Sequence, residues 1–156
     1  MGRIMGVDYG ERRLGLAVSD PSGRLAANAL PTLDRRKLKG GPEEAVARLA
    51  EEWEVEEIVV GLPVNMDGSQ GPAARKVEEF AARLAGLSGL PVSTWDERLT
   101  TVVAQRVQAD LNLPRAKRRE KGRLDRTAAL LLLQNYLDFR NRHQRDSRAG
   151  GQGSAV

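Results

Sequence analysis

The sequence predicts an α/β protein with a mixed β-sheet, and two observations carry this prediction. Three apolar stretches near the N-terminus are separated by short connections rich in turn residues, a pattern typical of an antiparallel meander. Helical and strand-like patterns then alternate along the rest of the chain, as in proteins whose parallel strands are joined by helices. The 156 residues are enough for one domain with a substantial hydrophobic core.

The predicted meander begins with the strand that organises the rest of the chain. Its strands are expected at residues 3–10, 13–19 and 25–33. In the first strand Ile4, Gly6 and Asp8 share one face, because successive side chains point to opposite sides. Asp8 therefore leaves the strand next to Gly10, where a ligand or a backbone can come close. Taken alone, Asp8 fits equally well as the cap of the following turn.

The remaining elements are predicted from apolar residues at four-residue spacing and from short apolar runs. Helices are expected to begin at Pro42 and to span residues 72–87, about 100–111 and about 123–142, with strands at residues 57–61 and 90–95. Residues 1–142 are thus expected to form a single domain. The polar, Gly- and Ser-containing residues 143–156 are expected to be a disordered tail.

Composition limits the class of protein. The chain has no cysteine, which excludes disulfides and thiolate chemistry and fits a reducing cytoplasm. No apolar run approaches the roughly 20 residues that span a bilayer, and no signal peptide is recognised, so no membrane partner is expected. Aromatic residues make up only 4% of the chain, which weighs against a protein that binds single strands by stacking bases.

Charge is divided unevenly along the chain. Residues 1–114 hold 14 Lys or Arg against 17 Asp or Glu, whereas residues 115–156 hold 11 against 4. One end of the molecule therefore suits a polyanion, most simply a nucleic-acid backbone. A basic C-terminal segment that only aids solubility would explain the same counts.

Asp125 is the most informative residue of the last predicted helix. It lies in line with the apolar stripe, because Ala128 and Ala129 follow at three and four residues. A carboxylate in that position needs a cation or a hydrogen-bond partner, since burying an unpaired charge is costly. The alternative is an Asp in the first turn that interacts with the helix dipole or with Arg123 or Arg126.

Three carboxylates could converge on one edge of the sheet. Asp8 ends one strand, Glu97 follows another and Asp125 lies on a covering helix. Three oxygen ligands without His or Cys suit Mg²⁺ or Mn²⁺ better than Zn²⁺, and such sites position a substrate phosphate and activate water for phosphodiester hydrolysis. Asp96 competes with Glu97 for this role, because alternation points the two to opposite faces. An Asp-Glu-Arg turn that pairs with itself, through Arg98, is the plainer interpretation of that segment.

Two loops are candidates for contacts with a nucleic-acid backbone. The loop at residues 62–71 follows a strand at the edge where open α/β sheets bind ligands, and its backbone N–H groups could hold a phosphate. The loop could equally be a long connection that ends at the next helix. A basic loop at residues 113–122 is the second candidate. The side chains proposed as contacts are Asn65, Ser69, Arg98, Lys117, Arg118, Arg119 and Lys121.

Four blocks of the sequence resemble the YqgF/RuvX family. They lie at residues 4–20, 59–69, 95–101 and 125–129, in the order found in the family, and the match covers residues 3 to about 138. The resemblance implies an RNase H-like fold, with a five-stranded mixed sheet of order 3-2-1-4-5 and helices on both faces. It also implies a cytoplasmic nuclease related to the RuvC resolvases.

Carried over block by block, the resemblance implies that Asp8, Glu97 and Asp125 are the catalytic, metal-binding acids, with Mg²⁺ or Mn²⁺ as cofactor. It implies two substrates: the 5′ end of precursor 16S ribosomal RNA, which we favour, or a four-way DNA junction. Symmetric cuts in a junction need a homodimer, although no segment indicates a dimer interface. Two rival classes are an ATP-binding phosphotransferase, which needs a second lobe that this chain lacks, and a nucleic-acid-binding module without catalysis.

Overall fold

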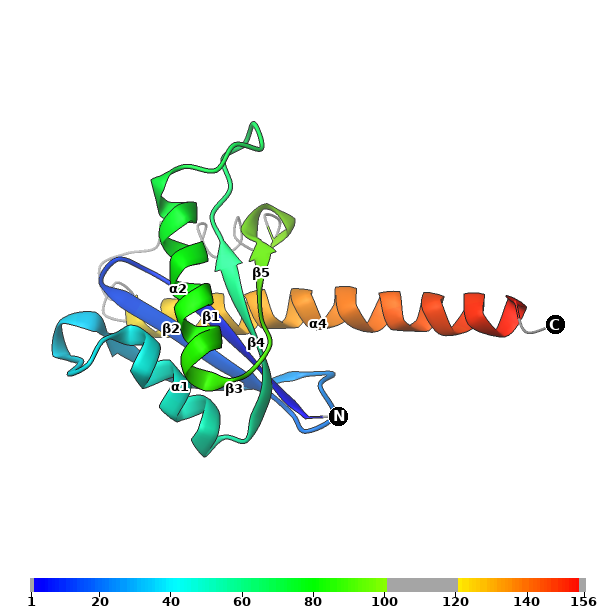
Figure 1. Ribbon diagram of the computed structural model, residues 1–156, viewed down its shortest axis with the longest axis horizontal. Helices are drawn as coiled ribbons and strands as arrows, with labels where there is room; N and C mark the ends of the chain where they lie inside the picture. Colours follow the sequence, from blue (N-terminus) through cyan, green and yellow to red (C-terminus); the bar gives the residue numbers. More distant parts are fainter. Residues whose placement is uncertain (1, 101–120, 155–156) are drawn as a thin grey trace.

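The computed structural model describes residues 2–100 and 121–154, with side chains described for residues 2–98 and 128–144. The strands are β1 (Arg3–Tyr9), β2 (Arg13–Ser19), β3 (Ala26–Asp34), β4 (Val55–Leu62) and β5 (Val92–Asp96). The α-helices are α1 (Pro42–Glu52), α2 (Pro72–Ser88) and α4 (Lys121–Ser154), and the short 3₁₀ helices are η1 (Arg35–Lys37) and η2 (Glu97–Thr100) (Figure 1). The helix predicted near residues 100–111 and most of the predicted basic loop lie outside the described residues.

The five strands form one mixed sheet in the order β3-β2-β1-β4-β5, which confirms the predicted topology. β1 pairs antiparallel with β2, and β2 with β3, so the N-terminal meander is present. β1 pairs in parallel with β4, and β4 with β5. Consequently β1, β3, β4 and β5 all end at the same edge of the sheet. We call it the carboxyl edge, and the opposite one the amino edge.

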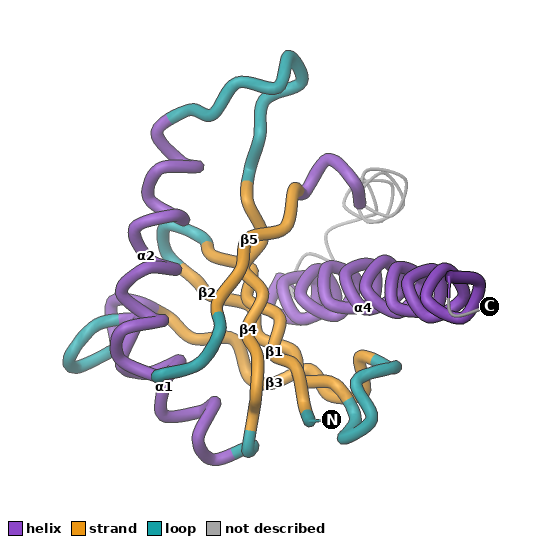
Figure 2. Tube along the Cα trace, turned by 45° about the vertical axis from the view of Figure 1, so that its right-hand side comes forward, coloured by secondary structure: helices purple, strands orange, loops and turns teal. Residues whose placement is uncertain are grey.

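Helices cover both faces of the sheet, and Figure 2 shows α1 and α2 on one side with α4 on the other. The alternation of side chains in β1 explains how each face acquires its own core. Met5 and Val7 pack in the cluster that contains the apolar side chains of α1 and α2. Ile4 packs with Val59 and with the apolar side chains of α4. The predicted face of Ile4, Gly6 and Asp8 is therefore the face that α4 covers.

Gly6 lets α4 lie close against the middle of β1. A Cβ atom at this position would lie 2.9 Å from Leu133 Cβ and 3.4 Å from the carbonyl oxygen of Ala129. Ala129 is fully buried there, as expected for a small residue at a close helix–sheet contact. The small residues of this contact fix how deep the helix sits, and with it the distance between the helix and the strand that carries Asp8.

The ends of α1 and α2 follow from local chemistry. Both helices have proline in their first turn, where the missing N–H is not needed, and α1 adds Glu43 and Glu44 in its first turn. α2 ends at Ser88 and is capped by Gly89, which has a φ of 69° and donates its N–H to the carbonyl of Ala85. These boundaries agree with the predicted starts at Pro42 and Pro72.

The last helix is longer than the sequence predicts. α4 begins at Lys121, two residues early, and continues to Ser154, so it includes residues 143–154 that were expected to be disordered. The prediction relied on the polar, Gly- and Ser-containing composition of this segment, whereas the helix continues through it on backbone hydrogen bonds, in a stretch without proline. In Figure 1 this part of α4 extends past the sheet. Within the described part of the chain, no helix is long and apolar enough to cross a membrane.

Candidate active site at the carboxyl edge

Asp8 lies one residue before the end of β1, at the carboxyl edge. It pairs with Gly15 of β2 and is half-buried. It stands two residues after Gly6, so it belongs to the face that α4 covers. The end of the central strand therefore presents a carboxylate just beyond the packed part of the α4 interface.

Glu97 begins η2 directly after β5, and its side chain lies over β4. A Cβ atom on Gly61 of β4 would be only 2.7 Å from Glu97 Oε1 and 3.3 Å from Glu97 Cγ. Gly61 pairs with Trp95 of β5, and the pairing of β4 with β1 ends one residue earlier, at Val60 and Val7. Because β4 separates β5 from β1, the missing side chain at Gly61 leaves the space through which Glu97 reaches towards Asp8.

The two carboxylates influence each other electrostatically. Burial, followed by the negative charges of Asp8 and Asp96, raises the pKa of the Glu97 carboxyl to about 7. Its ordinary value would be 4.5, so the folded protein disfavours the charged form. A cation placed between Asp8 and Glu97 would offset both the burial and the repulsion. The described part of the chain thus brings together two of the three predicted acids.

Asp96 has a different partner from Glu97. Arg98 donates to Asp96 through its backbone N–H (2.9 Å), its Nε (3.0 Å) and its Nη2 (2.7 Å). The hydrogen bond from the Arg98 side chain holds the pKa of Asp96 below its usual value. The self-paired turn and the acid at the sheet edge therefore occur side by side: Asp96 pairs with Arg98, and Glu97 faces Asp8.

Asp125 lies on α4 one turn before Ala129, and its side chain is outside the described set. The contacts of α4 with the sheet show the direction in which the helix runs. Ala129 and Leu133 lie against Gly6 in the middle of β1. Further along the helix, Gln134 accepts a hydrogen bond from Ala26 N–H, and Asn141 donates to the Gly23 carbonyl at the amino edge. The start of α4 therefore points towards the carboxyl edge and Asp8. Among the side chains that are described, no group of three acids, His or Cys forms a metal site.

The loop after β4 uses its predicted contact residues to hold its own turn. Asn65 Nδ2 donates to Ser69 Oγ at 3.0 Å, and Ser69 donates its N–H and its hydroxyl to Asp67 Oδ1. Arg98 Nη1 lies 3.8 Å from where a Cβ of Gly68 would be, so the loop tip is next to η2. Arg98 is exposed there. The backbone of this loop and the side chain of Arg98, from η2, therefore lie next to each other at the carboxyl edge.

The remaining predicted contacts fall on the part of the chain that cannot be described. Lys117, Arg118 and Arg119 lie outside the described residues, and Lys121 starts α4 with an undescribed side chain. The missed signal in the site is Gly61, because a glycine inside an apolar strand marks a close approach by another group.

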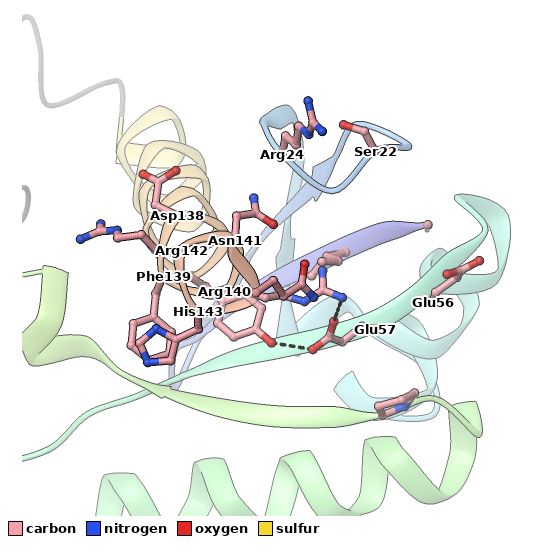
Figure 3. Close-up of a pocket in the computed structure, with 15 residues that line it drawn as sticks. Ser22, Arg24, Glu56, Glu57, Asp138, Phe139, Arg140, Asn141, Arg142 and His143 are labelled. Atoms are coloured by element: carbon pink, nitrogen blue, oxygen red, sulfur yellow. Dashed lines mark hydrogen bonds and ion pairs between the residues drawn. The ribbon is translucent and has the colours of Figure 1, made fainter. Parts of the chain in front are cut away.

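A cavity of about 1300 Å³ lies at the opposite, amino edge (Figure 3). It is lined by the starts of β1 and β4, the β2–β3 turn and the middle of α4. Glu57 accepts a hydrogen bond from the Tyr136 hydroxyl at 2.5 Å and forms an ion pair with Arg140 at 3.5 Å. These partners anchor α4 to the sheet. The convergent carboxylates are at the other end of the molecule, so this cavity is not the candidate active site.

The topology and the acids at the carboxyl edge define the class of the protein as RNase H-like. A model of the RuvX family, described as Holliday junction resolvase, matches residues 2–139. The chain belongs to this nuclease family, as the four sequence blocks predicted.

Relatives and solved structures agree with this assignment. A protein of Pelotomaculum thermopropionicum named "Putative pre-16S rRNA nuclease" is 45% identical over 96% of this chain and 94% of its own length. A protein of the same name from Moorella thermoacetica is 48% identical over 87% and 94%. Thermus thermophilus RuvC in complex with a Holliday junction substrate has a TM-score of 0.54 at 19% identity, over 89% of this chain and 96% of RuvC. Fowlpox virus resolvase with junction DNA also has a TM-score of 0.54, at 14% identity over 87% and 97%. These two structures confirm the fold.

Proposed function

We propose that this protein is a divalent-metal-dependent endonuclease that matures the 5′ end of precursor 16S ribosomal RNA in the cytoplasm. The observation that carries the proposal is the position of Glu97. Its side chain lies over Gly61, and its pKa is raised by burial and by the neighbouring Asp8. A partly buried acid whose pKa is raised by a neighbouring acid is typical of functional sites. The names of the relatives support ribosomal RNA as the substrate, and the lack of cysteine fits the compartment.

The proposed cofactor is Mg²⁺ or Mn²⁺, and the donor set fits it. Asp8 and Glu97 supply carboxylate oxygens, which hard divalent cations prefer, and Asp125 is the proposed third ligand. When bound, such an ion activates water and stabilises the charge that develops on the phosphate during hydrolysis. The acids hold the cation, and Gly61 keeps the space above β4 free for the Glu97 side chain. Glu97 has to lose its proton first, so we expect binding to strengthen as the pH rises through about 7.

The substrate backbone is proposed to contact the groups that flank the acids. Side-chain hydrogen bonds to Asp96 orient the exposed Arg98, so its guanidinium is held in a fixed direction at this edge. The backbone of the loop after β4, with Asn65 and Ser69, lies next to it. Lys117, Arg118, Arg119 and Lys121 are the proposed basic contacts beyond η2. These contacts would position the backbone without reading its sequence.

The proposal is tested by cleavage assays on two substrates in Mn²⁺ and in Mg²⁺. The wild type is compared with Asp8→Asn, which keeps the shape of the side chain and removes the charge. We expect cuts at one defined position of a precursor 16S RNA fragment, and we expect these cuts to disappear in Asp8→Asn while circular dichroism shows an unchanged fold. Wild-type cleavage that persists in Asp8→Asn would contradict the mechanism. The absence of any metal-dependent cutting would favour a binding module without catalysis.

A second candidate, resolution of four-way DNA junctions, is favoured by the description of the matching family. Paired symmetric cuts in a mobile junction, with the RNA left intact, would establish it. Such cuts need two active sites, so this candidate also requires a homodimer. Analytical ultracentrifugation of the protein with the junction gives the number of chains bound.

A further inference from the structure

A second group of basic side chains lies at the carboxyl edge, on the side of β3. The 3₁₀ helix η1 directly follows β3, which ends at the same edge as β1. We define the η1 surface as the side chains of Arg12, Arg36, Lys37 and Lys39, all of which are exposed. In Figure 1 the segment that contains η1 is the pale blue to cyan part at the left. None of these four side chains belongs to the proposed active site.

The η1 surface is fixed relative to Asp8. Arg35 Nη1 donates to the carbonyl of Gly10 at 3.2 Å and to that of Glu11 at 3.0 Å. The guanidinium of Arg35 also lies over the Tyr9 ring, 4.8 Å from its centre. In addition, the Arg35 N–H donates to the Arg12 carbonyl at 2.8 Å. These contacts tie η1 to the β1–β2 turn, whose first residue follows the strand that carries Asp8.

Three carboxylates near this surface, Asp34, Glu43 and Glu44, already have partners, while the exposed Glu11 stands next to Arg12 in the β1–β2 turn. Asp34 accepts from the Arg36 N–H at 3.0 Å and pairs with Arg36 Nε at 3.5 Å. At the start of α1, the two glutamates form ion pairs elsewhere: Glu43 with Arg83 at 3.6 Å, and Glu44 with Arg48 at 3.5 Å. Across residues 2–98 and 128–144, no ion pair involves Lys37 or Lys39. Their charges are therefore available to a polyanion.

The acids lie between two basic flanks of the same edge. Arg98 stands after β5 on one side, and the η1 surface stands after β3 on the other. The order β3-β2-β1-β4-β5 separates these strands by four spacings, or roughly 19 Å. Each strand of a B-form duplex carries a phosphate about every 3.4 Å along the helix axis, so about five or six phosphates of one strand of such a duplex cover that width.

We propose that the η1 surface binds the sugar–phosphate backbone of the substrate on the side of the cleaved bond opposite to Arg98. The nucleic acid then crosses the carboxyl edge from β3 to β5 and is held on both sides of Asp8 and Glu97. This inference rests on the proposed nuclease function. It adds that the enzyme binds the substrate backbone on both sides of the cleaved phosphodiester bond, and that this bond therefore lies within the nucleic-acid chain and not at its end.

Binding of the full-length protein to a structured RNA tests the inference. Asp8→Asn serves as the background, so that the RNA stays intact, and anisotropy gives the affinity at KCl concentrations between about 50 and 200 mM. Lys37→Ala/Lys39→Ala removes two proposed phosphate contacts. We expect the negative slope of log K against log salt to become shallower by about 1.4 to 1.8. An unchanged slope would overturn the inference.

The matched control is Arg24→Ala/Arg142→Ala. It removes the same number of charges from exposed side chains around the amino-edge cavity, where Figure 3 shows both. The slope should stay the same in this variant. An equal fall in both double variants would mean that only net charge matters, which would also overturn the inference.

Cleavage by chains that retain Asp8 separates this inference from the proposed function. With an RNA that extends on both sides of the cut, Lys37→Ala/Lys39→Ala should raise KM several-fold and leave kcat unchanged. With an RNA shortened on the η1 side, the variant and the wild type should have the same KM. Cleavage with equal KM values on the long RNA would refute the η1 surface alone. A wild type that cuts nothing would refute the proposed function, whatever the salt slopes show.

Discussion

Two partly buried carboxylates that lie close together repel each other, and Glu97 shows the consequence. Its pKa is raised to about 7, mainly by burial and then by Asp8 and Asp96. The folded state therefore holds a proton on Glu97 at pH values where the unfolded chain, with an ordinary pKa of 4.5, has lost it. As the pH rises from about 4.5 to about 7, this group lowers the free energy of unfolding of the metal-free protein.

Glu97→Gln should remove this penalty. In EDTA, we expect the variant and the wild type to have similar free energies of unfolding near pH 5. Near pH 8 the variant should be more stable by roughly 1–3 kcal/mol, because only the wild type then carries the buried charge. Urea denaturation at both pH values measures the difference. A difference that does not change between the two pH values would show that Glu97 titrates normally.

At the residue scale, alternation within a strand predicted the face of Asp8 but could not choose between Asp96 and Glu97. Side chains alternate between the two faces only within a strand, and β5 stops at Asp96, so Glu97 already belongs to η2. The choice depends on Gly61, which is 36 residues away in sequence and leaves room for the Glu97 side chain. The engagement of Asp96 by Arg98 is local, and the sequence predicted that turn as one alternative.

At the scale of elements, the seating of α4 on β1 sets the distance between Asp8 and the start of the helix. The contact depends on Gly6, since its neighbours include the backbone of Ala129 and the Cβ of Leu133, which cannot move aside without the helix. The predicted alignment of Asp125 with Ala129 matches this arrangement on the helix backbone. The length of α4 could not be predicted, because a polar helix that extends past the sheet has no apolar stripe to mark it.

Gly6→Ala should destabilise the protein by about 1–3 kcal/mol, because overpacking forces the helix and strand apart. It should also reduce cleavage, since α4 carries one proposed ligand. Gly86→Ala in α2 is the matched control, because a Cβ there meets nothing within 4 Å. It should stabilise the protein by about 0.4–1 kcal/mol through the entropy of the unfolded chain. Thermal denaturation of both variants measures the effects, and equal changes in the two would refute the close contact.

At the scale of the whole molecule, the direction of the strands gathers the functional groups. Four of the five strands end at the carboxyl edge, so residues from distant parts of the sequence meet there: η1, Asp8, the loop after β4, and η2. The sequence patterns predicted the meander and the alternation of helices and strands. The strand order came only from the family resemblance, because pairing between distant strands leaves no local signal in one sequence.

We expect Asp8 and Glu97, and not Asp96, to hold the cation for phosphodiester cleavage. This assignment is tested by single-turnover cleavage of the precursor RNA in Mn²⁺ by Asp8→Asn, Glu97→Gln and Asp96→Asn. Loss of a ligand costs several kcal/mol, so the first two variants should be slower by roughly 100-fold or more. Asp96→Asn should stay within about 10-fold of the wild type, because Asp96 pairs with Arg98 and is not a proposed ligand. An inactive Asp96→Asn beside an active Glu97→Gln would contradict this assignment of the acids.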